Sequence, residues 1–367
     1  MAPRRKLFGN YEETAVISMN ISIIIPTYNR LASLKRVLKG LENQTLAPAN
    51  FEVVVVSDGA TDGTDEFLAN LATPLTLNPV FQVNAGAAAA RNAGIQTAVG
   101  DLVVFLDDDV VPAPQLLAEH LRAHAAEGDN LVVLGPMITP ADFVMAPWVQ
   151  WEQAMMVKQY TAMTHGDWEP TARQFYTGNT SLPRSYLLAS GGFDTQFKRA
   201  EDVELAYRLA DSGLRFVFNA AAIGYHYAER SFTSWMNIAY AYGRNDVIFA
   251  QEKGQTWLLT TIWREYRQRN VIIQAITSVG LGRPFISQLI LKLLEISALA
   301  GYKLGLKTLA AQAYSGIFNL RYYQGTADQL GSRAAFFAGL SAPNAVTPDQ
   351  SGNDTSRPPA QTSMVDR

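Results

Sequence analysis

The sequence predicts an α/β protein in which a mostly parallel sheet flanked by helices is followed by a helical C-terminal extension. Short apolar runs alternate with helical patterns from residue 21 to residue 106, which is typical of a parallel sheet covered on both faces. From residue 233 onwards the apolar residues recur at helical spacing. The chain has 367 residues, of which 48% are hydrophobic, and this length suits two domains or one large domain with an appendage.

Local patterns define the individual elements. The strands are β-branched or otherwise apolar runs, and Pro26 ends the first of them. The helices show an apolar face, as in residues 32–41, or are rich in Ala. The predicted strands are residues 21–25, 52–56, a run that closes at Gln82 and Val83, 102–106 and 215–218. The predicted helices are residues 32–41, 65–71, 87–97, 201–212, 233–252, 256–277 and long amphipathic helices over 284–323, interrupted at Gly301, Gly305 and Gly316.

These elements divide the chain into four predicted parts. Residues 1–18 form a polar tail that we expect to be disordered, and Met19 is an alternative natural start. Residues 19–250 form the α/β domain, with halves at 19–112 and 113–250. A basic helical extension covers 251–340. Residues 341–367 are rich in Ser, Thr, Pro, Asn and Asp, a composition typical of disorder.

Composition excludes several classes of protein. The chain has no cysteine, which excludes disulfide scaffolds, thiolate zinc sites, iron–sulfur clusters and a cysteine nucleophile. A net charge of -3 argues against a nucleic-acid-binding protein. We predict no secretory signal and no membrane span, because the longest charge-free stretch, residues 67–90, contains two Pro, three Asn and a Gln. The expected location is therefore cytoplasmic.

Polar groups gather where the predicted parallel strands end. Residues 27–30 (Thr-Tyr-Asn-Arg), residues 57–59 (Ser-Asp-Gly) and the acidic run at 107–109 each follow an apolar strand. In open α/β sheets the ligand lies outside the carboxyl ends of the strands. The sequence therefore predicts a binding site at this edge.

The run Asp107, Asp108 and Asp109 is the first candidate for metal binding. Three adjacent carboxylates repel one another unless a cation lies between them, and carboxylate oxygens select hard ions such as Mn2+ or Mg2+. Because Mg2+ usually combines one or two carboxylates with substrate phosphates, a nucleoside diphosphate is the natural co-ligand. The alternative is a solvated loop that caps the following helix.

Two further residues could contact a nucleotide. Asp58 follows a strand and could accept a hydrogen bond from a base or a ribose; the alternative is an Asx turn without a ligand. Arg91 is the only charge in a long neutral neighbourhood and needs an anionic or planar partner. The alternative for Arg91 is a place at the rim of a tightly packed helix.

Together these motifs resemble the family 2 glycosyltransferases, which have the nucleotide-diphospho-sugar transferase (GT-A) fold. The resemblance covers roughly residues 20–230. It rests on several motifs that occur in one order. They are residues 23–30 (IIIPTYNR), 56–59 (VSDG), 61–64 (TDGT), 91–94 (RNAG), 105–109 (FLDDD), 178–181 (GNTS), 191–194 (GGFD) and 201–205 (EDVEL).

The resemblance implies a role for each matching position. Thr27 and Tyr28 would line the base pocket, and Pro26 and Arg30 belong to the same nucleotide-sugar site. Asp58 would accept from the base, and Arg91 would help to hold the nucleotide. The resemblance also implies an acidic metal motif. Asp107 and Asp109 would form an Asp-x-Asp pair for Mn2+ or Mg2+, with Asp109 as the more direct ligand, while Asp108 would contact the nucleotide sugar or orient its neighbours.

The implied reaction is an inverting transfer of a sugar from a nucleotide-diphosphate sugar, a UDP-sugar first of all, to a hydroxyl of a glycan or lipid-linked acceptor. Asp202, beside Glu201, would be the base that takes the hydroxyl proton. His226 would contact the metal or the diphosphate, or would be an ordinary histidine of an aromatic cluster. The expected process is cell-surface polysaccharide or glycolipid biosynthesis.

Two rival functions remain. A sugar nucleotidyltransferase would need a Gly-rich signature with Arg or Lys after the first strand, and residues 26–29 (PTYN) are not one. A catalytically weak sugar-nucleotide sensor or scaffold would be expected to lose Asp109 or Asp202, and both are present.

The C-terminal helices have their own charge pattern. Residues 1–250 contain 18 Lys and Arg against 26 Asp and Glu, whereas residues 251–340 contain 10 against 4. Residues 284–323 could therefore lie on a membrane surface with lysines reaching the headgroups. Alternatively, Leu289, Leu293 and Ile296 pack on the catalytic domain. No uncharged run in 284–307 exceeds eight residues, which argues against a membrane span.

Two other groups of residues are open to more than one interpretation. His120 and His124 lie four residues apart, as metal ligands on a helix do, but a solvated helix face is the favoured interpretation because no third ligand is near. Trp148 and Trp151, with Met155 and Met156, could form a wall for the sugar or part of the core.

Overall fold

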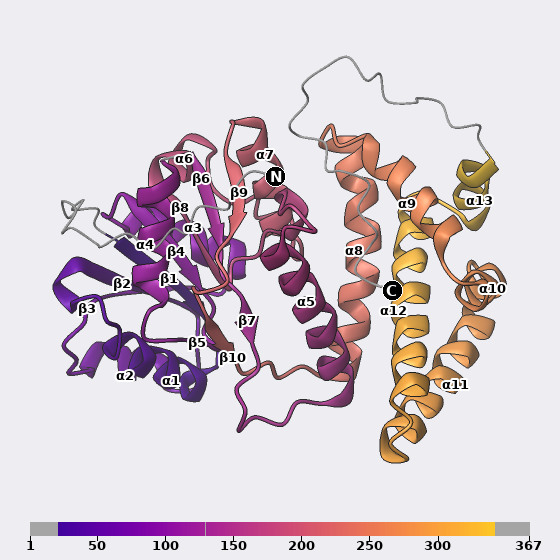
Figure 1. Cartoon of the computed structure of the whole chain (residues 1–367), viewed down its shortest axis with the longest axis horizontal. Helices are drawn as coiled ribbons and strands as arrows, with labels where there is room; N and C mark the ends of the chain where they lie inside the picture. The colour runs from indigo at the N-terminus through magenta and orange to yellow at the C-terminus, as the bar shows by residue number, and fades with distance from the viewer. Residues whose placement is uncertain (1–20, 129, 342–367) are drawn as a thin grey trace, which may run out of the picture.

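The computed structural model of the chain describes residues 21–128 and 130–341. The predicted tail at 1–18, the start at Met19 and the C-terminal tail from residue 342 onwards lie outside the described residues. Figure 1 shows an α/β body with a layered set of C-terminal helices packed against one side of it.

A seven-stranded sheet forms the centre of the α/β body. Its order is β3 (Thr76–Gln82), β2 (Phe51–Asp58), β1 (Ile21–Thr27), β4 (Leu102–Leu106), β8 (Asn179–Pro183), β6 (Leu131–Leu134) and β9 (Arg215–Phe218). Only β8 runs antiparallel to its neighbours, and every other adjacent pair of this sheet is parallel. The predicted fold class, a mostly parallel sheet flanked by helices, is confirmed.

Side chains alternate between the two faces of the sheet, as the pleat of a strand requires. On β1, Ile24 packs with Val54 and Phe105 in one apolar cluster, whereas Ile23 and Ile25 belong to a second cluster. Both faces are therefore buried, which explains why the strands read as continuous apolar runs.

Helices cover both faces. One cluster includes residues of α1 (Leu31–Glu42) and α4 (Leu116–Glu127). The other includes residues of α3 (Ala87–Thr97), α6 (Arg184–Ala189) and α7 (Glu201–Asp211). The remaining helices of the body are α2 (Thr64–Asn70) and α5 (Pro147–His165), with short 3-10 turns at η1 (Pro48–Asn50) and η2 (Ala172–Gln174).

A small second sheet lies at the carboxyl end of the central strands. It has the order β5 (Val110–Pro112), β10 (Gly224–His226) and β7 (Met137–Ile138). In its register His226 is opposite Val110. This pairing places the end of β10 directly beside the acidic run that follows β4.

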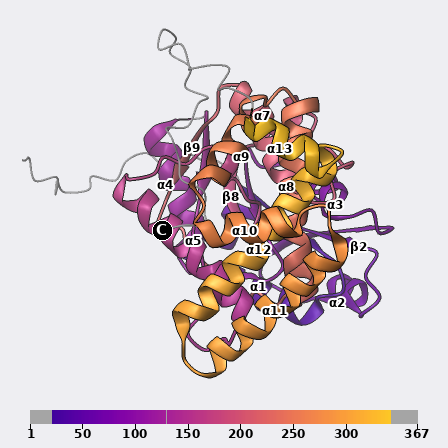
Figure 2. The ribbon, with the colours of Figure 1, turned by 90° about the vertical axis from the view of Figure 1, so that its right-hand side faces the viewer.

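The C-terminal part consists of α8 (Phe232–Glu252), α9 (Trp257–Gln268), α10 (Val271–Gly280), α11 (Pro284–Lys303), α12 (Lys307–Gln329) and α13 (Arg333–Ser341). The long helices α8 and α12 lie side by side, and α11 packs on α12 (Figures 1 and 2). Trp235 of α8 shares an apolar cluster with Tyr314 and Ile317 of α12.

Three predictions for the helices need correction. Residues 256–277 form two helices, because the side chain of Asn270 accepts from the backbone N–H of Ile273 and starts α10. Gly301 and Gly316 do not interrupt a helix. They lie inside α11 and α12, where the missing side chains let the two helices approach closely. Gly305, with φ +71°, does lie between the two helices.

The expectation that no segment could span a membrane is also not borne out for α11. By length and composition alone, this helix is the one described helix that could cross a bilayer. The single lysine and glutamate in its middle interrupt the apolar runs but leave the helix predominantly apolar.

Candidate active site

The site is built where β1, β2 and β4 end at the same edge of the sheet. Thr27 on β1 is opposite Ser57 on β2, and both are buried. Asp58 follows at the end of β2, and Asp107 follows β4. The structure therefore brings together the three strand ends that the sequence singles out.

Asp58 holds the loop that leads into α3. Its Oδ1 accepts from Gln82 Nε2 at 2.7 Å and from the backbone N–H of Ala85 at 2.8 Å, and its Oδ2 accepts from the N–H of Gly86 at 2.8 Å. Asp58 is thus a buried carboxylate that fixes this loop. Any contact to a base must use the acceptor capacity that these three donors leave.

Arg91 joins the two halves of the site. It is 6% exposed, and its guanidinium lies 2.9 Å from Asp107 Oδ1 and 3.0 Å from Glu201 Oε1. Burial alone would lower the pKa of Arg91, but the negative charges of Asp107, Glu201 and Asp202 raise it above its usual value. The alternative, a place at the rim of a packed helix, therefore does not hold for Arg91. It is a buried bridge between the end of β4 and the start of α7.

Asp108 is fixed by residues of the β1 end. Its Oδ2 accepts from Thr27 Oγ1 at 2.8 Å, and its Oδ1 accepts from Arg30 Nη1 at 3.1 Å. Burial raises the pKa of Asp108 to about 6, with Asp109 adding to the shift and Arg30 opposing it. Pro26 and Tyr28 flank this contact on the chain, and the Tyr28 side chain is half exposed.

Asp109 lies between a guanidinium and an imidazole. Its Oδ2 accepts from Arg30 Nη1 at 2.5 Å, and its Oδ1 is 3.5 Å from His226 Nε2. The ring of His226 is held at the end of β10, where the next residue, Tyr227, donates its N–H to the carbonyl of Asp109 at 2.9 Å. His226 therefore lies beside Asp109 at the candidate site.

The donor set suits a hard divalent ion. Carboxylate oxygens are ligands that Mg2+ and Mn2+ prefer. Asp109 presents one oxygen toward His226, and Asp107 Oδ2 lies near the backbone of Gly178. In the part of the chain that the structure describes, no three His, Asp or Glu side chains form a complete metal cluster. Such an ion would therefore need further oxygens from a diphosphate.

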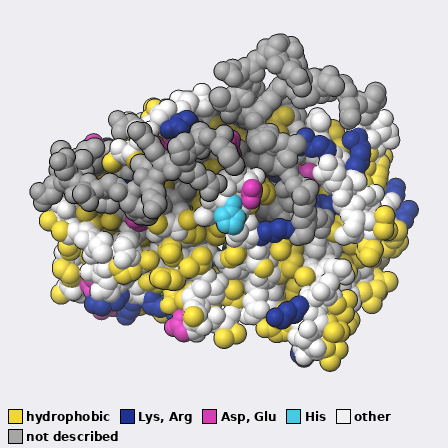
Figure 3. Space-filling model, in the orientation of Figure 1, with side chains coloured by type: hydrophobic (Ala, Val, Ile, Leu, Met, Phe, Trp, Pro, Cys, Tyr) yellow, Lys and Arg dark blue, Asp and Glu magenta, His cyan; other side chains and the backbone are white. Residues whose placement is uncertain are grey.

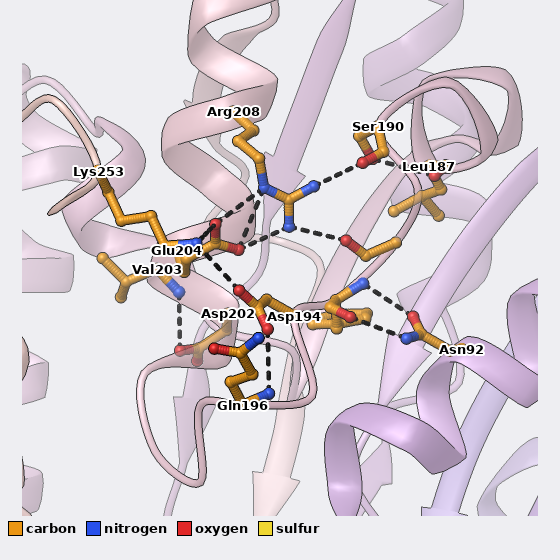
Figure 4. A network of polar contacts seen from close by, with 12 residues as sticks. Asn92, Leu187, Ser190, Asp194, Gln196, Asp202, Val203, Glu204, Arg208 and Lys253 are labelled. Carbon is orange, nitrogen blue, oxygen red and sulfur yellow. Dashed lines mark hydrogen bonds and ion pairs between the residues drawn. The ribbon is translucent and has the colours of Figure 1, made fainter. Parts of the chain in front are cut away.

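Asp202 lies in the first turn of α7, next to Glu201. The turn is entered through Ala200 in the left-handed region, with φ 58°, and Asp202 Oδ1 accepts from the N–H of Val203 at 2.8 Å (Figure 4). Burial and the charge of Glu201 raise the pKa of Asp202 to about 7, although Arg91 opposes the shift. A carboxylate that releases its proton near pH 7 is suited to act as a base.

A second polar network links α7 to the loop 190–194 (Figure 4). Arg208 donates to Glu204 and to the backbone carbonyls of Ser190 and Gly192 at 2.6 and 2.7 Å. The amide of Asn92 bonds both the carbonyl and the N–H of Phe193 at 2.8 Å. The loop 190–194 is thereby tied to both α3 and α7.

Sequence reasoning missed most of this support. The Glu204–Arg208 pair has the four-residue spacing of helix ion pairs and could have been found from the sequence. The bonds from Asn92 to Phe193 and from Gln82 to Asp58 join residues 101 and 24 positions apart, and no spacing rule would have found them.

A cavity of about 270 Å³ opens beside Arg30. Tyr227 and Glu229, which the sequence analysis did not single out, contribute to it, and Arg36 lies over the Tyr227 ring at 4.4 Å. The full lining is Asn29, Arg30, Leu31, Ala32, Ser33, Asp62, Tyr227 and Glu229. Small polar ligands could therefore approach Arg30 from this side.

The favoured interpretation of His120 and His124 as a solvated face is wrong. Both side chains are buried. His120 bonds Asn179 at 2.9 Å and Ser181 at 2.8 Å, and His124 bonds Ser181 at 2.9 Å. Because β8 carries polar side chains toward α4, these histidines are partners of the sheet. Burial lowers the pKa of each to about 4.

The tryptophans are part of the packing between α5 and the C-terminal helices. Trp151 is buried and lies with Trp235 and Phe318 at ring distances of 5.7 and 5.5 Å. Trp148 donates its indole N–H to the carbonyl of Arg230 at 2.9 Å. Met155 packs at the same cluster, whereas Met156 packs at a cluster of the sheet. Core packing is therefore the interpretation that the contacts support.

Comparison with known proteins agrees with the fold and the motifs. Residues 22–187 match the model of the family described as Glycosyl transferase family 2. The matched part of the chain is similar to that family. It contains the ends of β1, β2 and β4, together with Arg91 and the acidic run.

One curated relative is named as a glucosyltransferase and another as a hyaluronan synthase. Validoxylamine A glucosyltransferase of Streptomyces hygroscopicus subsp. limoneus is 36% identical over 226 residues, covering 53% of this chain and 48% of the relative. Hyaluronan synthase of Pasteurella multocida is 30% identical over 241 residues, covering 57% of this chain and 24% of the relative. The chain thus spans about half of the first relative and a quarter of the second.

A solved structure extends the likeness in fold beyond the matched segment. The mannosyltransferase PcManGT from Pyrobaculum calidifontis, solved in complex with GDP-Man and Mn2+, has a TM-score of 0.56 and 21% sequence identity. The match covers 83% of this chain and 87% of that chain. The fold is therefore shared well beyond residue 187.

Proposed function

We propose that this protein is a metal-dependent inverting glycosyltransferase. It transfers a sugar from a nucleotide-diphosphate sugar, a UDP-sugar as the first candidate, to a hydroxyl of a glycan or lipid-linked acceptor in cell-surface polysaccharide or glycolipid biosynthesis. The observation that carries the proposal is the buried bridge of Arg91 between Asp107 and Glu201. This bridge holds the acidic residues that follow β4 beside the carboxylate of Asp202, so that the proposed donor site and the proposed base lie next to each other.

The nucleotide half binds the donor. Pro26, Thr27, Tyr28, Arg30 and Asp58 lie at the ends of β1 and β2, and the half-exposed ring of Tyr28 is available to a base. Asp109, Asp107 and His226 would hold Mn2+ or Mg2+ together with the diphosphate. A bound divalent ion would offset the negative charge that grows on the departing diphosphate. The Mn2+ in the mannosyltransferase complex supports this choice.

Asp202 acts as the base. As the acceptor oxygen attacks the anomeric carbon, its proton passes to the carboxylate of Asp202, and the bond to the diphosphate breaks in the same displacement. The configuration at the anomeric carbon is thereby inverted. A pKa of about 7 leaves a large fraction of Asp202 ionised at neutral pH while keeping it a stronger base than an ordinary carboxylate.

The proposed catalytic unit is residues 19–250, with 251–340 as its helical extension, and the proposed location is cytoplasmic. The names of the relatives support a role in glycan assembly. The rival function, a sensor that binds nucleotide sugars without turnover, is not favoured because Asp109 follows β4 and Asp202 lies in the first turn of α7, so both carboxylates are in place.

Replacing Asp202 tests the proposal. Asp202→Asn should keep the affinity for the donor but lower turnover by about 100- to 10,000-fold, the usual contribution of a positioned base. Asp211→Asn, at the exposed far end of the same helix, is the matched control and should keep full turnover. Donor hydrolysis and transfer to hydroxyl acceptors, measured across a panel of nucleotide sugars with Mn2+, provide the readout. Near-normal turnover of the Asn variant would remove Asp202 from the role of base.

A further inference from the structure

The outer faces of α10 and α11 form a large apolar surface, which we call the α10–α11 surface. On α11 the exposed fractions of Phe285, Leu289, Leu293 and Ile296 are 87%, 61%, 55% and 54%. These residues are spaced by four, four and three positions, so they lie along one side of the helix. The surface also includes Val271, Ile272 and Val279 of α10, Ile286, Leu299 and Tyr302 of α11, and Leu304, Leu306 and Leu309 where the chain turns into α12.

The opposite face of α11 is already occupied. Ser287, Ala298 and Gly301 are buried against α12, and a side chain at Gly301 would meet the backbone of Ala310 at 2.9 Å. Beyond residue 310, most apolar side chains of α12 are buried, among them Ile317 and Leu320. Within the segment 284–323, therefore, α12 packs on the protein. Helix α11 lies on the outer side of α12 (Figure 2), and the exposed fractions show that its apolar side faces outward.

Basic residues accompany the apolar ones. Within residues 271–309 the charged residues are Arg283, Lys292, Lys303 and Lys307 against the single acid Glu295, which pairs with Lys292 at 2.9 Å. Arg283 lies just before α11, Lys303 is the last residue of α11, and Lys307 is the first residue of α12. Figure 3 shows hydrophobic side chains beside Lys and Arg at the lower right, where α11 lies. The surface is therefore apolar and positive in a chain whose net charge is -3.

We propose that the α10–α11 surface binds the surface of a membrane that contains anionic phospholipids. A helix with one apolar side and lysines at its flanks lies in the plane of the interface, with its apolar side among the acyl chains and the lysines extended to the headgroups. Anionic headgroups complement the excess of positive charge. A spanning arrangement would require α11 to leave α12, and it would place Lys292 in the hydrocarbon.

Flotation with lipid vesicles tests this inference on the full chain without any sugar substrate, so the result does not depend on the proposed reaction. The protein should float with vesicles of phosphatidylcholine that contain phosphatidylglycerol, and less with phosphatidylcholine alone. Binding should weaken at high salt. Failure of the full chain to float with the anionic vesicles would overturn the proposal.

Two pairs of variants separate the apolar and the charged contributions. Phe285→Ser with Leu289→Ser should abolish flotation, whereas Val99→Ser with Val144→Ser, at 74% and 87% exposure on the α/β body, should not change it. Lys303→Gln with Lys307→Gln should lower the partition coefficient by roughly 25-fold, because each basic residue near an anionic leaflet contributes about five-fold. Lys39→Gln with Arg122→Gln, also exposed, is the matched control and should stay within about two-fold.

The α10–α11 surface could instead bind a second copy of this chain. Sedimentation tests this alternative, and circular dichroism checks that each variant is folded. The inference expects a monomer without vesicles, and each variant should keep the helical signal of the parent. A dimer that dissociates on Phe285→Ser with Leu289→Ser, combined with no flotation of the parent chain, would show that the surface is a protein interface and would refute the membrane assignment.

Discussion

The guanidinium of Arg30 lies where a cation would be expected beside Asp109. A single nitrogen, Nη1, is 2.5 Å from Asp109 Oδ2 and 3.1 Å from Asp108 Oδ1. The two carboxylates are mostly buried, and their mutual repulsion needs a positive charge between them. Arg30 supplies that charge in the present structure. It therefore both stabilises the acidic run and competes with a divalent ion for Asp109.

The first prediction concerns Asp109 as a ligand. Asp109→Asn should lower the affinity for UDP in the presence of Mn2+ by at least about ten-fold, because a neutral amide replaces a carboxylate that a hard cation prefers. Titration calorimetry with UDP, with and without Mn2+, provides the measurement. Asp101→Asn, exposed at the far end of β4, is the control. Equal Mn2+-dependent affinities in the parent chain and in Asp109→Asn would exclude Asp109 from the metal site.

The second prediction concerns the competition by Arg30. Arg30→Gln should bind Mn2+ more tightly than the parent chain in the absence of nucleotide, by roughly ten-fold, since one positive charge leaves the immediate neighbourhood of Asp109. Electron paramagnetic resonance of free Mn2+ measures the affinity directly. Arg122→Gln on α4 keeps the site intact and should match the parent. Weaker Mn2+ binding by Arg30→Gln would show that Arg30 supports the site rather than competing for it.

The third prediction concerns the pH dependence of turnover. Asp202 must be ionised to act as a base, so turnover should fall as the pH falls below about 7, the value to which burial and Glu201 raise its pKa. Glu201→Gln removes a nearby negative charge and leaves Arg91 less neutralised. Both changes lower the pKa of Asp202, so the acidic limb of the profile should move to lower pH.

The pH profile of turnover under saturating substrates is the readout for this shift. Glu66→Gln, an exposed change on α2, should leave the limb in place. A limb that stays fixed in Glu201→Gln, or moves to higher pH, would mean that a group other than Asp202 controls the profile.

The parts of the fold that the sequence predicted well are those in which local pattern and burial agree. The strands β1 and β2 are buried on both faces and contain uninterrupted runs of Ile or Val, so these runs were unambiguous. β8 escaped detection because Asn179, Thr180 and Ser181 are polar and yet buried. Their partners include His120 and His124. Because the inward side chains of β8 are hydrogen-bonded and polar, the strand has no hydrophobic pattern by which the sequence could reveal it.

The site shows the same division. Asp58 and Asp107–Asp109 each follow a strand in the sequence. Because the carboxyl ends of parallel strands lie at one edge of a sheet, the sequence could predict that these residues converge. The contact between Arg91 and Glu201 joins residues 110 positions apart, and it depends on how α7 packs beside α3. Likewise, the apolar periodicity of α11 identified an amphipathic helix but could not show which side of it is packed.

The fourth prediction concerns the stability of the buried histidines in acid. Burial holds the pKa of His120 at about 4, against about 6.5 for the ordinary side chain. Between these values the unfolded chain binds a proton that the folded chain does not, so the free energy of unfolding falls as the pH falls from 6.5 toward 4. While only the unfolded form titrates, one histidine contributes about 1.4 kcal/mol per pH unit.

His120→Gln should reduce this slope by about 1.4 kcal/mol per pH unit, the contribution of one proton. Glutamine does not titrate, but it can still form hydrogen bonds to Asn179 and Ser181. Urea unfolding at pH 7.5, 6.5 and 5.5 measures the slope, and any constant loss of stability from imperfect packing cancels in it. His165→Gln, at the exposed end of α5, has no buried proton site to remove and should retain the slope of the parent. If His120→Gln loses stability in acid as steeply as the parent chain does, the buried histidine is not the group that the unfolded chain protonates in this range.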